Sequence, residues 1–394
     1  MRFAFLATGL LFVFGVGWLF SYDRHHIKFK SMAELFTLQI IISFFCLNTT
    51  AGIKMLNGIS GFFGWLMEQA AGGINFVFGG LVVKSGSTVF FLNVLMPIVF
   101  ISALIGILNY IKVLPFVIKW TGKGLNKIGH MGDLESYLAV STAVLGQPEV
   151  YLTVLDEIPH LSEKRLYTIC ASGMSSVSAS ILASYMKLIP GKFVVVAVFL
   201  NILSALIVSC IINPYDTSKE NKNFKVRTEK LPFFEMLGNY IMNGFQMAIC
   251  VGAMLIGFVA LVTFLNSTFT VLFHITFTTV IGYIFAPVAW IMGVSGQDIV
   301  KVGSLMAEKL IANEFVAMGD YQPLASGLTA KSQAIISAYM VSFANFGTLG
   351  TIIGSIRSIS KEQASYVAKF AMRLLLGATL ASILTGTIVG VYFN

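Results

Sequence analysis

Two carboxylates in the middle of apolar stretches are the first side chains of this sequence that could do chemistry. Glu149 lies in TAVLGQPEVYL, and Glu314 lies in LIANEFVAMGDY. An ionisable side chain within a membrane segment costs about 2.5–3.5 kcal/mol on insertion scales, so it is by default a functional residue. We therefore treat both carboxylates as candidates for binding a polar ligand or a proton.

Neutral polar groups interrupt two further apolar stretches. The stretch at 165–187 contains SGMSSVSAS, with five serines within nine residues, and the stretch at 333–356 contains SFANFGTLGT, with Asn345 between two phenylalanines. Small residues and amides can simply allow close helix packing. Hydroxyls and unwound backbone beside a polar tip can also bind a cation or a ligand, which is the interpretation we favour.

Metal and catalytic sites of the common kinds are not indicated. The histidines have no zinc-ligand spacing, and the cysteines lie far apart in apolar runs. We expect these cysteines to be small buried hydrophobic residues: Cys46, Cys170, Cys210 and Cys250. The sequence contains neither G-x-S-x-G nor H-E-x-x-H, so we do not predict an enzyme.

The composition places these residues in a membrane. The chain has 394 residues, of which 56% are hydrophobic and 11% are charged, and its mean hydropathy is +0.83. Soluble domains average about 45–50% apolar and about 25% charged residues. One soluble core cannot bury this excess, so we predict an all-α polytopic membrane protein and exclude disorder, coiled coil and disulfide-stapled secreted modules.

Eight apolar stretches are long enough to span a bilayer core, which takes roughly 20 residues. They lie at about 3–21, 32–49, 88–111, 165–187, 193–213, 238–265, 333–356 and 365–392. The first is interpreted as a retained helix rather than a signal peptide, because its basic flank DRHHIKFK follows it. Lysine and arginine concentrate after the first, third, fifth and seventh spans, which places those loops in the cytoplasm and both termini outside. The net charge of +8 is thus mainly a topology signal, and no nucleic-acid partner is expected.

Two segments are too polar to cross the membrane alone. Residues 133–160 break at Gly146–Glu149, and residues 295–328 break at Asn313–Glu314. Two apolar half-runs that meet at a polar centre predict a re-entrant helical hairpin whose tip lines a protein cavity. Each hairpin follows a span and an interfacial helix and precedes two spans, and the two start on opposite sides. This order predicts an inverted repeat, an arrangement common in secondary transporters.

The remaining segments complete the predicted architecture. Interfacial or scaffold helices are expected at Gly58–Gly80, Leu114–Met131 and Leu272–Gly293. We divide the chain into N-terminal scaffold helices with an interfacial helix (1–111), a first repeat (112–213), a cytoplasmic basic loop (214–237), a scaffold span with an interfacial helix (238–294) and a second repeat (295–394).

At these positions the sequence resembles the concentrative nucleoside transporter family, in particular its bacterial proton-linked branch. The matching stretches are INFVFGG at 74–80, FFLNVLMPIVFISALIGIL at 90–108, GQPEV at 146–150, SGMSSVSASI at 172–181, GAMLIGFVALV at 252–262, NEFVAM at 313–318 and SFANFGTLG at 342–350. The resemblance covers nearly the whole chain. It implies a homotrimer in the bacterial inner membrane, in which each protomer carries one nucleoside per cycle by an elevator-like motion of a transport domain against a scaffold.

The resemblance also implies roles for single residues. The first hairpin tip would read the base through Gln147 and Glu149, and the ribose would be held by three residues: Glu314, Asn345 and Thr348. Apolar surfaces would come from Ile181 and Phe343. The chemistry agrees, because a carboxylate can accept from vicinal hydroxyls, whereas an amide both donates and accepts.

Two departures from the family pattern concern the base and the coupling ion. Pro148 stands between Gln147 and Glu149 where the family usually has Thr or Ser, so a hydroxyl is lost beside the base. Thr142 stands where the family's sodium site has an Asn. A weaker oxygen site would remain at Thr142, Leu145, Ser176 and Val177. We therefore favour protons over sodium as the coupling cation, with Glu149 as the first candidate for the titrating group, and expect no other cofactor.

The sequence thus predicts a cation-coupled importer of nucleosides such as uridine. One alternative is a channel or facilitator, against which the paired hairpins argue because a fixed pore needs no second gate. A less favoured alternative is an intramembrane enzyme in which Glu149 and Glu314 meet across the repeat as an acid–base pair.

Overall fold

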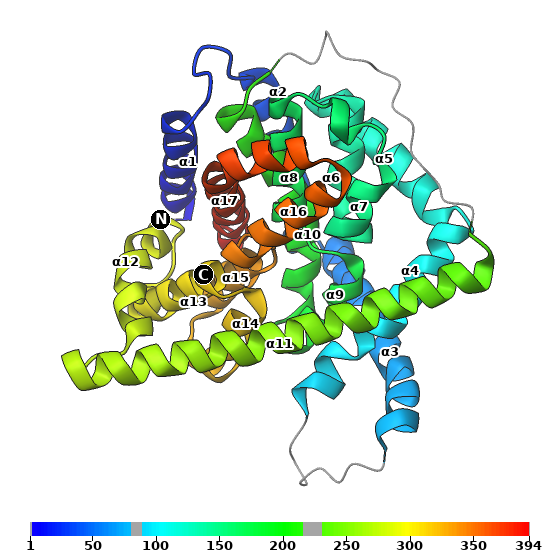
Figure 1. Ribbon diagram of the computed structural model, residues 1–394. Helices are drawn as coiled ribbons and strands as arrows, with labels where there is room; N and C mark the ends of the chain where they lie inside the picture. Colours follow the sequence, from blue (N-terminus) through cyan, green and yellow to red (C-terminus); the bar gives the residue numbers. More distant parts are fainter. Residues whose placement is uncertain (1, 80–88, 216–230, 394) are drawn as a thin grey trace.

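The computed structural model describes residues 2–79, 89–215 and 231–393. This part of the chain consists of helices and their connections, without a β-strand, which confirms the predicted all-α fold (Figure 1). Six of its helices are long and apolar enough to cross a membrane: Phe29–Asn48, Phe91–Tyr110, Glu163–Leu188, Gly191–Ile212, Phe233–Phe273 and Lys361–Gly390. Of the other two predicted spans, 3–21 is the shorter apolar helix Phe3–Leu19. The span predicted at 333–356 is a pair of half-helices.

The N-terminal part supplies three helices: α1 (Arg2–Leu19), α2 (Phe29–Asn48) and α3 (Thr50–Phe78). The Thr49 hydroxyl accepts a hydrogen bond from the Gly52 amide at 3.0 Å and so caps α3. Because this cap directly follows α2, α3 begins before the predicted helix Gly58–Gly80, and the prediction of its start was wrong. Gly80 lies outside the described residues.

A π-helical turn opens the next membrane helix. The elements here are η1 (Phe91–Leu95), α4 (Pro97–Tyr110) and α5 (Val113–Gly129). The Met96 amide donates to the Phe91 carbonyl at 3.0 Å, a π-type bond that ends where Pro97 has no amide hydrogen to continue the pattern. Helix α5 confirms the helix predicted at Leu114–Met131.

The predicted element order occurs twice in the structure. The first series is α6 (Asp133–Leu145), α7 (Gln147–Thr153), η2 (Ile158–His160), α8 (Glu163–Ser175), α9 (Ala179–Leu188) and α10 (Gly191–Ile212). The second is η3 (Gly296–Asp298), α13 (Ile299–Ile311), α14 (Glu314–Leu324), η4 (Ala325–Gly327), α15 (Ala330–Met340), α16 (Phe346–Ile359) and α17 (Lys361–Gly390). Each series contains a hairpin of two half-helices, then a broken helix, then a long helix.

Helix α11 (Phe233–Phe273) is longer than its predicted span of 238–265. Its 41 residues reach about 60 Å at 1.5 Å per residue, roughly twice the thickness of a bilayer core. The helix starts directly after Pro232, inside the predicted loop 214–237, and residues 216–230 of that loop lie outside the described residues. Polar residues near both ends lowered the local hydropathy, which made the predicted span too short. Figure 1 shows α11 crossing the whole width of the molecule, followed by α12 (Phe277–Ile291).

Helix α11 packs closely on α4 because glycines lie at the contact. A Cβ atom on Gly106 would lie 2.6 Å from the Tyr240 ring, and one on Gly244 would lie 2.8 Å from Ser102. The Asn109 amide also donates to the Tyr240 hydroxyl at 3.0 Å. Small residues at such contacts are typical of helix packing in membranes.

Helix α10 lies at the centre of the molecule and is mostly buried (Figure 1). Its polar side chains bond to neighbouring helices. Asn201 donates to the Val341 carbonyl in the break between α15 and α16 and accepts from Thr385 of α17. Ser204 bonds to both Gln39 of α2 and Thr385. These bonds fix the broken helix of the second series against the centre of the fold.

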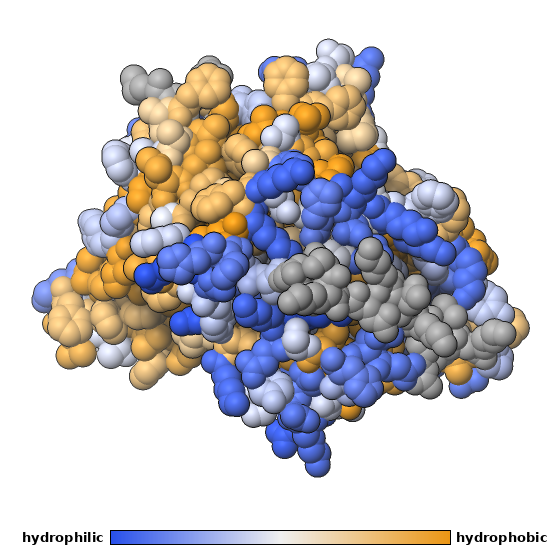
Figure 2. Space-filling view, turned by 90° about the horizontal axis from the view of Figure 1, so that it is seen from above, coloured by the Kyte–Doolittle hydropathy of each residue, from blue (hydrophilic) through white to orange (hydrophobic). Residues whose placement is uncertain are grey.

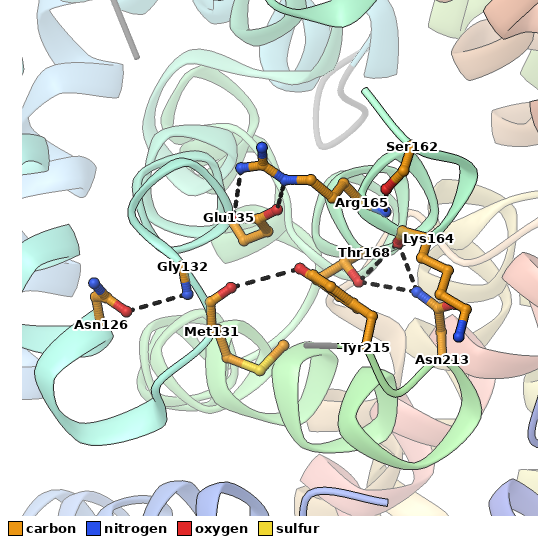
Figure 3. Close-up of polar contacts among 10 residues, drawn as sticks. All are labelled: Asn126, Met131, Gly132, Glu135, Ser162, Lys164, Arg165, Thr168, Asn213 and Tyr215. Carbon is orange, nitrogen blue, oxygen red and sulfur yellow. Dashed lines mark hydrogen bonds and ion pairs between the residues drawn. The ribbon is translucent and has the colours of Figure 1, made fainter. Parts of the chain in front are cut away.

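The start of the first hairpin is anchored by a polar network (Figure 3). Arg165 on α8 donates to both oxygens of the Glu135 carboxylate on α6, at 2.6 and 3.2 Å, and Glu135 is fully buried. Asn126 of α5 accepts from the Gly132 amide at 3.1 Å. These contacts join α5, α6 and α8.

The second hairpin is anchored at the corresponding place. The Asp298 carboxylate, just before α13, accepts from the amide and the hydroxyl of Thr329 at 3.0 and 2.9 Å. Thr329 caps α15, so this carboxylate joins the start of the hairpin to the start of the broken helix.

The surface of the molecule has polar and apolar regions. Figure 2 shows hydrophilic residues in the centre and lower part of one end of the molecule, with hydrophobic residues along its upper and left flanks. Large apolar side chains are exposed on α11 in particular, among them Ile256, Phe264 and Val271. Exposed apolar flanks of this kind are expected for a polytopic membrane protein.

Candidate functional site

The two hairpin tips and the two helix breaks meet at one cavity of about 790 Å³, its open mouth included. A concave site lined mostly by apolar side chains with a few polar groups suits a small organic ligand. Its lining comes from both series and from α11: Gly146, Gln147, Ser178, Ile181, Met247, Cys250, Val251, Met254, Phe258, Ala312, Asn313, Glu314, Phe315, Phe343, Asn345, Gly347, Thr348 and Thr351.

The tip of the first hairpin requires a glycine. Gly146 has φ of +96°, and a Cβ atom there would lie 3.1 Å from a Glu149 carboxylate oxygen and 3.2 Å from Ser178. This residue ends α6 and lets Gln147 begin α7. The Gln147 amide nitrogen donates to the Gly173 carbonyl on α8 at 2.5 Å. The first tip is therefore held against the broken helix that follows it.

The tip of the second hairpin presents Glu314, which is 4% exposed. Asn313 caps α14 by accepting from the Val316 amide at 3.0 Å, so Glu314 is the first helical residue. One carboxylate oxygen accepts from the Tyr185 hydroxyl of α9 at 2.7 Å, and the other accepts from the Asn345 amide at 3.0 Å. Glu314 thereby connects the broken helices of both series.

Asn345 is fixed by its own helix. It caps α16, because its side-chain oxygen accepts from the amide and the hydroxyl of Thr348 at 2.8 and 3.0 Å. Its amide nitrogen must therefore be the group that faces Glu314. A carboxylate has about four lone-pair sites, so Glu314 can still accept from ligand hydroxyls while it holds Tyr185 and Asn345.

The structure brings six of the seven predicted substrate-binding residues to the cavity: Gln147, Ile181, Glu314, Phe343, Asn345 and Thr348. Glu149 is half-buried and is not among the lining residues. Its carboxylate nevertheless lies at the first tip, where a Cβ atom on the lining residue Gly146 would be 3.1 Å from a Glu149 carboxylate oxygen. Glu149 is thus beside the cavity rather than part of its lining.

The predicted cation-binding residues lie at the end of α6 and in the break between α8 and α9. The Thr142 hydroxyl donates to the Ala139 carbonyl at 3.1 Å, which leaves its lone pairs available. Leu145 is the last residue of α6, and Ser176 and Val177 follow α8. Within the described residues, the buried Ser176 hydroxyl has no hydrogen-bond partner. Hydroxyl and carbonyl oxygens of this kind can bind a small cation, and they can equally bind a buried water.

Sequence reasoning missed three parts of the site. Tyr185 lies four residues after Ile181 on α9, a spacing that could have pointed to it. Lys309 lies five residues before Glu314 and was not considered as a partner. The third part is the side of α11 that faces the cavity between Met247 and Phe258. The sequence does not distinguish this side, because the helix is apolar on every side there.

Cys250 on α11 departs from the prediction that all four cysteines are buried. Cys46, Cys170 and Cys210 are buried, whereas Cys250 is exposed and lines the cavity. Alkylation by N-ethylmaleimide should therefore add bulk to the cavity and abolish nucleoside uptake, and saturating nucleoside should slow the labelling. The Cys250→Ser variant should transport normally and resist the reagent. Full uptake by protein that is stoichiometrically labelled at Cys250 would place this side chain outside the substrate path.

Comparison with known proteins gives consistent matches along the chain. Residues 193–390 match the family model of the Na⁺-dependent nucleoside transporter C-terminus, and residues 8–81 match that of the N-terminus. Residues 91–192 match a model described as nucleoside recognition.

Similar proteins cover the whole chain. The purine nucleoside transport protein NupG of Bacillus subtilis is 33% identical over 100% of both chains. The nucleoside permease NupC of Helicobacter pylori is 26% identical over 99% of this chain and 98% of its own. Among solved structures, CNTnw in an inward-facing substrate-bound state has 28% identity and a TM-score of 0.95 over 100% of both chains. A variant of CNTnw in an outward-facing state has 27% identity and a TM-score of 0.94 over 100% of this chain and 98% of the other.

Proposed function

Because the chain belongs to the concentrative nucleoside transporter family, we propose that it is a secondary active importer that takes up nucleosides in symport with a cation. It is a membrane transporter and not an enzyme, as the sequence predicted. The observation that carries the proposal is the Glu314 carboxylate, which lies with Asn345 in a cavity between two hairpin tips. Paired hairpins around one cavity suit a carrier with two gates better than a fixed pore.

In this proposal the ribose and the base bind at opposite tips. Glu314, Asn345 and Thr348 hold the ribose hydroxyls, and Gln147 reads the base with help from Glu149 across the first tip. Ile181 and Phe343 cover the apolar faces of the ligand.

The nucleosides we propose include uridine and also purine nucleosides. The similarity to a transporter described as acting on purine nucleosides supports the second group. Pro148 offers no hydroxyl to the base, so base selection would depend mainly on the Gln147 amide.

The family implies cation coupling, and we propose that the cation is a proton rather than sodium. Thr142 supplies a hydroxyl where the family pattern has an amide, which weakens a site made of Thr142, Leu145, Ser176 and Val177. Entry of one positive charge releases about 2.3 kcal/mol per 100 mV, which supports roughly 50-fold accumulation. Glu149 remains our first candidate for the proton-binding group.

The proposal extends to assembly, motion and location. We propose a homotrimer in the bacterial inner membrane, with both termini on the outer side and with the domains predicted from the sequence, except that the scaffold span after the basic loop begins at Phe233. The transport domain would move like an elevator against scaffold helices that include α11.

Uptake into proteoliposomes under imposed gradients tests the coupling. We expect labelled uridine to accumulate above its external concentration when a proton gradient and an inside-negative potential are imposed, and to equilibrate without them. Unlabelled guanosine, inosine and cytidine in competition will rank the bases. Accumulation under a sodium gradient alone would replace the proton by sodium, and equilibration that ignores both gradients would favour a facilitator.

A further inference from the structure

Lys309 is a buried basic side chain that the proposed substrate contacts do not use. It lies on α13 and has no exposed surface. Its ammonium donates to the Tyr339 carbonyl at 3.0 Å, to the Ser342 hydroxyl at 2.6 Å and to the Ser382 hydroxyl at 3.2 Å. The Tyr339 ring centroid lies 4.3 Å from the same nitrogen. The ammonium therefore has a full set of three acceptors and an aromatic ring beside it.

These partners are all neutral. Among the described residues, no carboxylate oxygen lies within 4.0 Å of the Lys309 nitrogen. Lysine within a membrane segment is rare and typically marks an ion pathway or a polar interior site. Oxygen ligands from a carbonyl and two hydroxyls resemble the surroundings of a bound monovalent cation more than those of a salt bridge.

Lys309 has nearly the same position in the second series as Thr142 has in the first, although within their own helices Thr142 is the tenth residue and Lys309 the eleventh. Helices α6 and α13 have 13 residues each. Thr142 lies five residues before Gln147, the first residue of α7, and Lys309 lies five residues before Glu314, the first residue of α14. Thr142 belongs to the weak oxygen site predicted beside the first helix break. Lys309 brings an ammonium to the second helix break.

The two breaks differ in how their polar groups are satisfied. Within the part of the chain that is described, three buried hydroxyls at the first break have no hydrogen-bond partner, namely Ser172, Ser175 and Ser176, whereas at the second break only Ser337 lacks one. At the second break, Lys309 satisfies the Tyr339 carbonyl and the Ser342 hydroxyl. Buried polar groups without partners are costly, so the first break needs a further ligand, whereas the second already contains one.

We propose that the Lys309 ammonium is a tethered cation that takes, at the second helix break, the place that the weak oxygen site of Thr142, Leu145, Ser176 and Val177 takes at the first. This inference rests on the proposed cation-coupled function. Only the first repeat then exchanges a cation with the solution in each cycle. Lys309 is a positioning residue, because it binds the Tyr339 carbonyl and the Ser342 hydroxyl, three residues before Asn345, and so helps to hold Asn345 against Glu314.

Chemical rescue of Lys309→Ala tests the proposal. The variant removes the propylammonium end of the side chain, and n-propylammonium in solution can replace that end. We expect the nucleoside Kd of the purified variant to rise roughly tenfold or more, since hydrogen bonds to charged groups contribute about 1.5–3 kcal/mol. Added n-propylammonium should return the Kd to within a few-fold of the wild-type value and should leave the wild type unchanged.

A second readout covers a variant that folds poorly. Lys309→Ala can be purified in n-propylammonium, and its melting temperature should then rise with amine concentration, because a ligand that binds the folded state stabilises it. Wild type should show no such rise. The matched control is Lys309→Met, which fills the space without charge, and we expect weak nucleoside binding that the amine does not restore.

Two outcomes would overturn the tethered-cation role. One is wild-type affinity in Lys309→Met, which would make the charge irrelevant, and the other is a Lys309→Ala protein whose Kd and melting temperature ignore the amine. Neither readout needs an ion gradient. A wild-type protein that fails to accumulate nucleoside would therefore contradict the proposed function without deciding the role of Lys309, which the melting temperature still reports.

Discussion

Glu314→Gln should weaken nucleoside binding roughly 10–100-fold and leave the protein folded. The variant glutamine can keep both present contacts by turning its oxygen toward the Asn345 amide and its NH₂ toward the Tyr185 hydroxyl, which can also accept. Asn345 cannot turn over, because its own oxygen holds the amide and the hydroxyl of Thr348. The amide then has one acceptor oxygen where the carboxylate had two, and no charge to strengthen bonds from vicinal ribose hydroxyls.

Deoxynucleosides separate a direct ribose contact from an indirect effect. For the wild type, 2′-deoxy and 3′-deoxy analogues should bind more weakly wherever a hydroxyl contact is lost. The Glu314→Gln substitution should then cost less for an analogue that lacks the contacted hydroxyl than for the ribonucleoside, because interacting groups are not additive. Binding is measured by calorimetry on purified protein, with the exposed Glu235→Gln as the control variant, which should match the wild type. Wild-type affinity in Glu314→Gln would remove this carboxylate from the site.

The hairpins and the broken helices could be predicted because polar residues interrupt apolar runs. The break at Gly146–Gln147 and the break at Asn313–Glu314 were found in this way, and in both places a half-helix ends within one or two residues of the predicted tip. In so apolar a chain, each polar interruption is a strong signal, since lipid cannot satisfy the unpaired backbone that it creates.

Features that depend on facing directions or on distant contacts could not be predicted in the same way. Gln147 and Glu149 both lie at the first tip, but only Gln147 is among the lining residues, and the sequence does not indicate which of the two would be. The lining contributed by α11 carries no sequence signal, because its stretch 247–258 is apolar on every side. The contact between Tyr185 and Glu314 joins residues 129 positions apart, which only the packed structure reveals.

Separation of the Glu135–Arg165 pair should produce the largest loss of stability among these variants. Glu135 has a side chain with 0% exposure, and that of Arg165 has 14% (Figure 3). Arg165→Met leaves the carboxylate buried without its cation, and removal of one partner from a buried pair destabilises a protein by about 3–5 kcal/mol. Thermal unfolding of purified protein checks this loss, and the exposed Lys30→Met, whose ion pair spans 3.9 Å at the surface, serves as the control with little expected change.

The two partners should not be equivalent, which makes this prediction sharper than a general loss of stability. Glu135→Gln keeps a neutral acceptor for Arg165, and the guanidinium reaches solvent, so this variant should lose less stability than Arg165→Met. A Glu135→Leu, Arg165→Met double variant should recover much of the loss, because replacement of a buried pair by apolar residues is often close to neutral. If the double variant recovers its melting temperature and loses transport, the pair serves to make the first hairpin move together with α8. If the double variant recovers both its melting temperature and transport, the Glu135–Arg165 pair serves stability alone. Equal losses of stability in Glu135→Gln and Arg165→Met would contradict the expected difference, which depends on Glu135 being more deeply buried than Arg165.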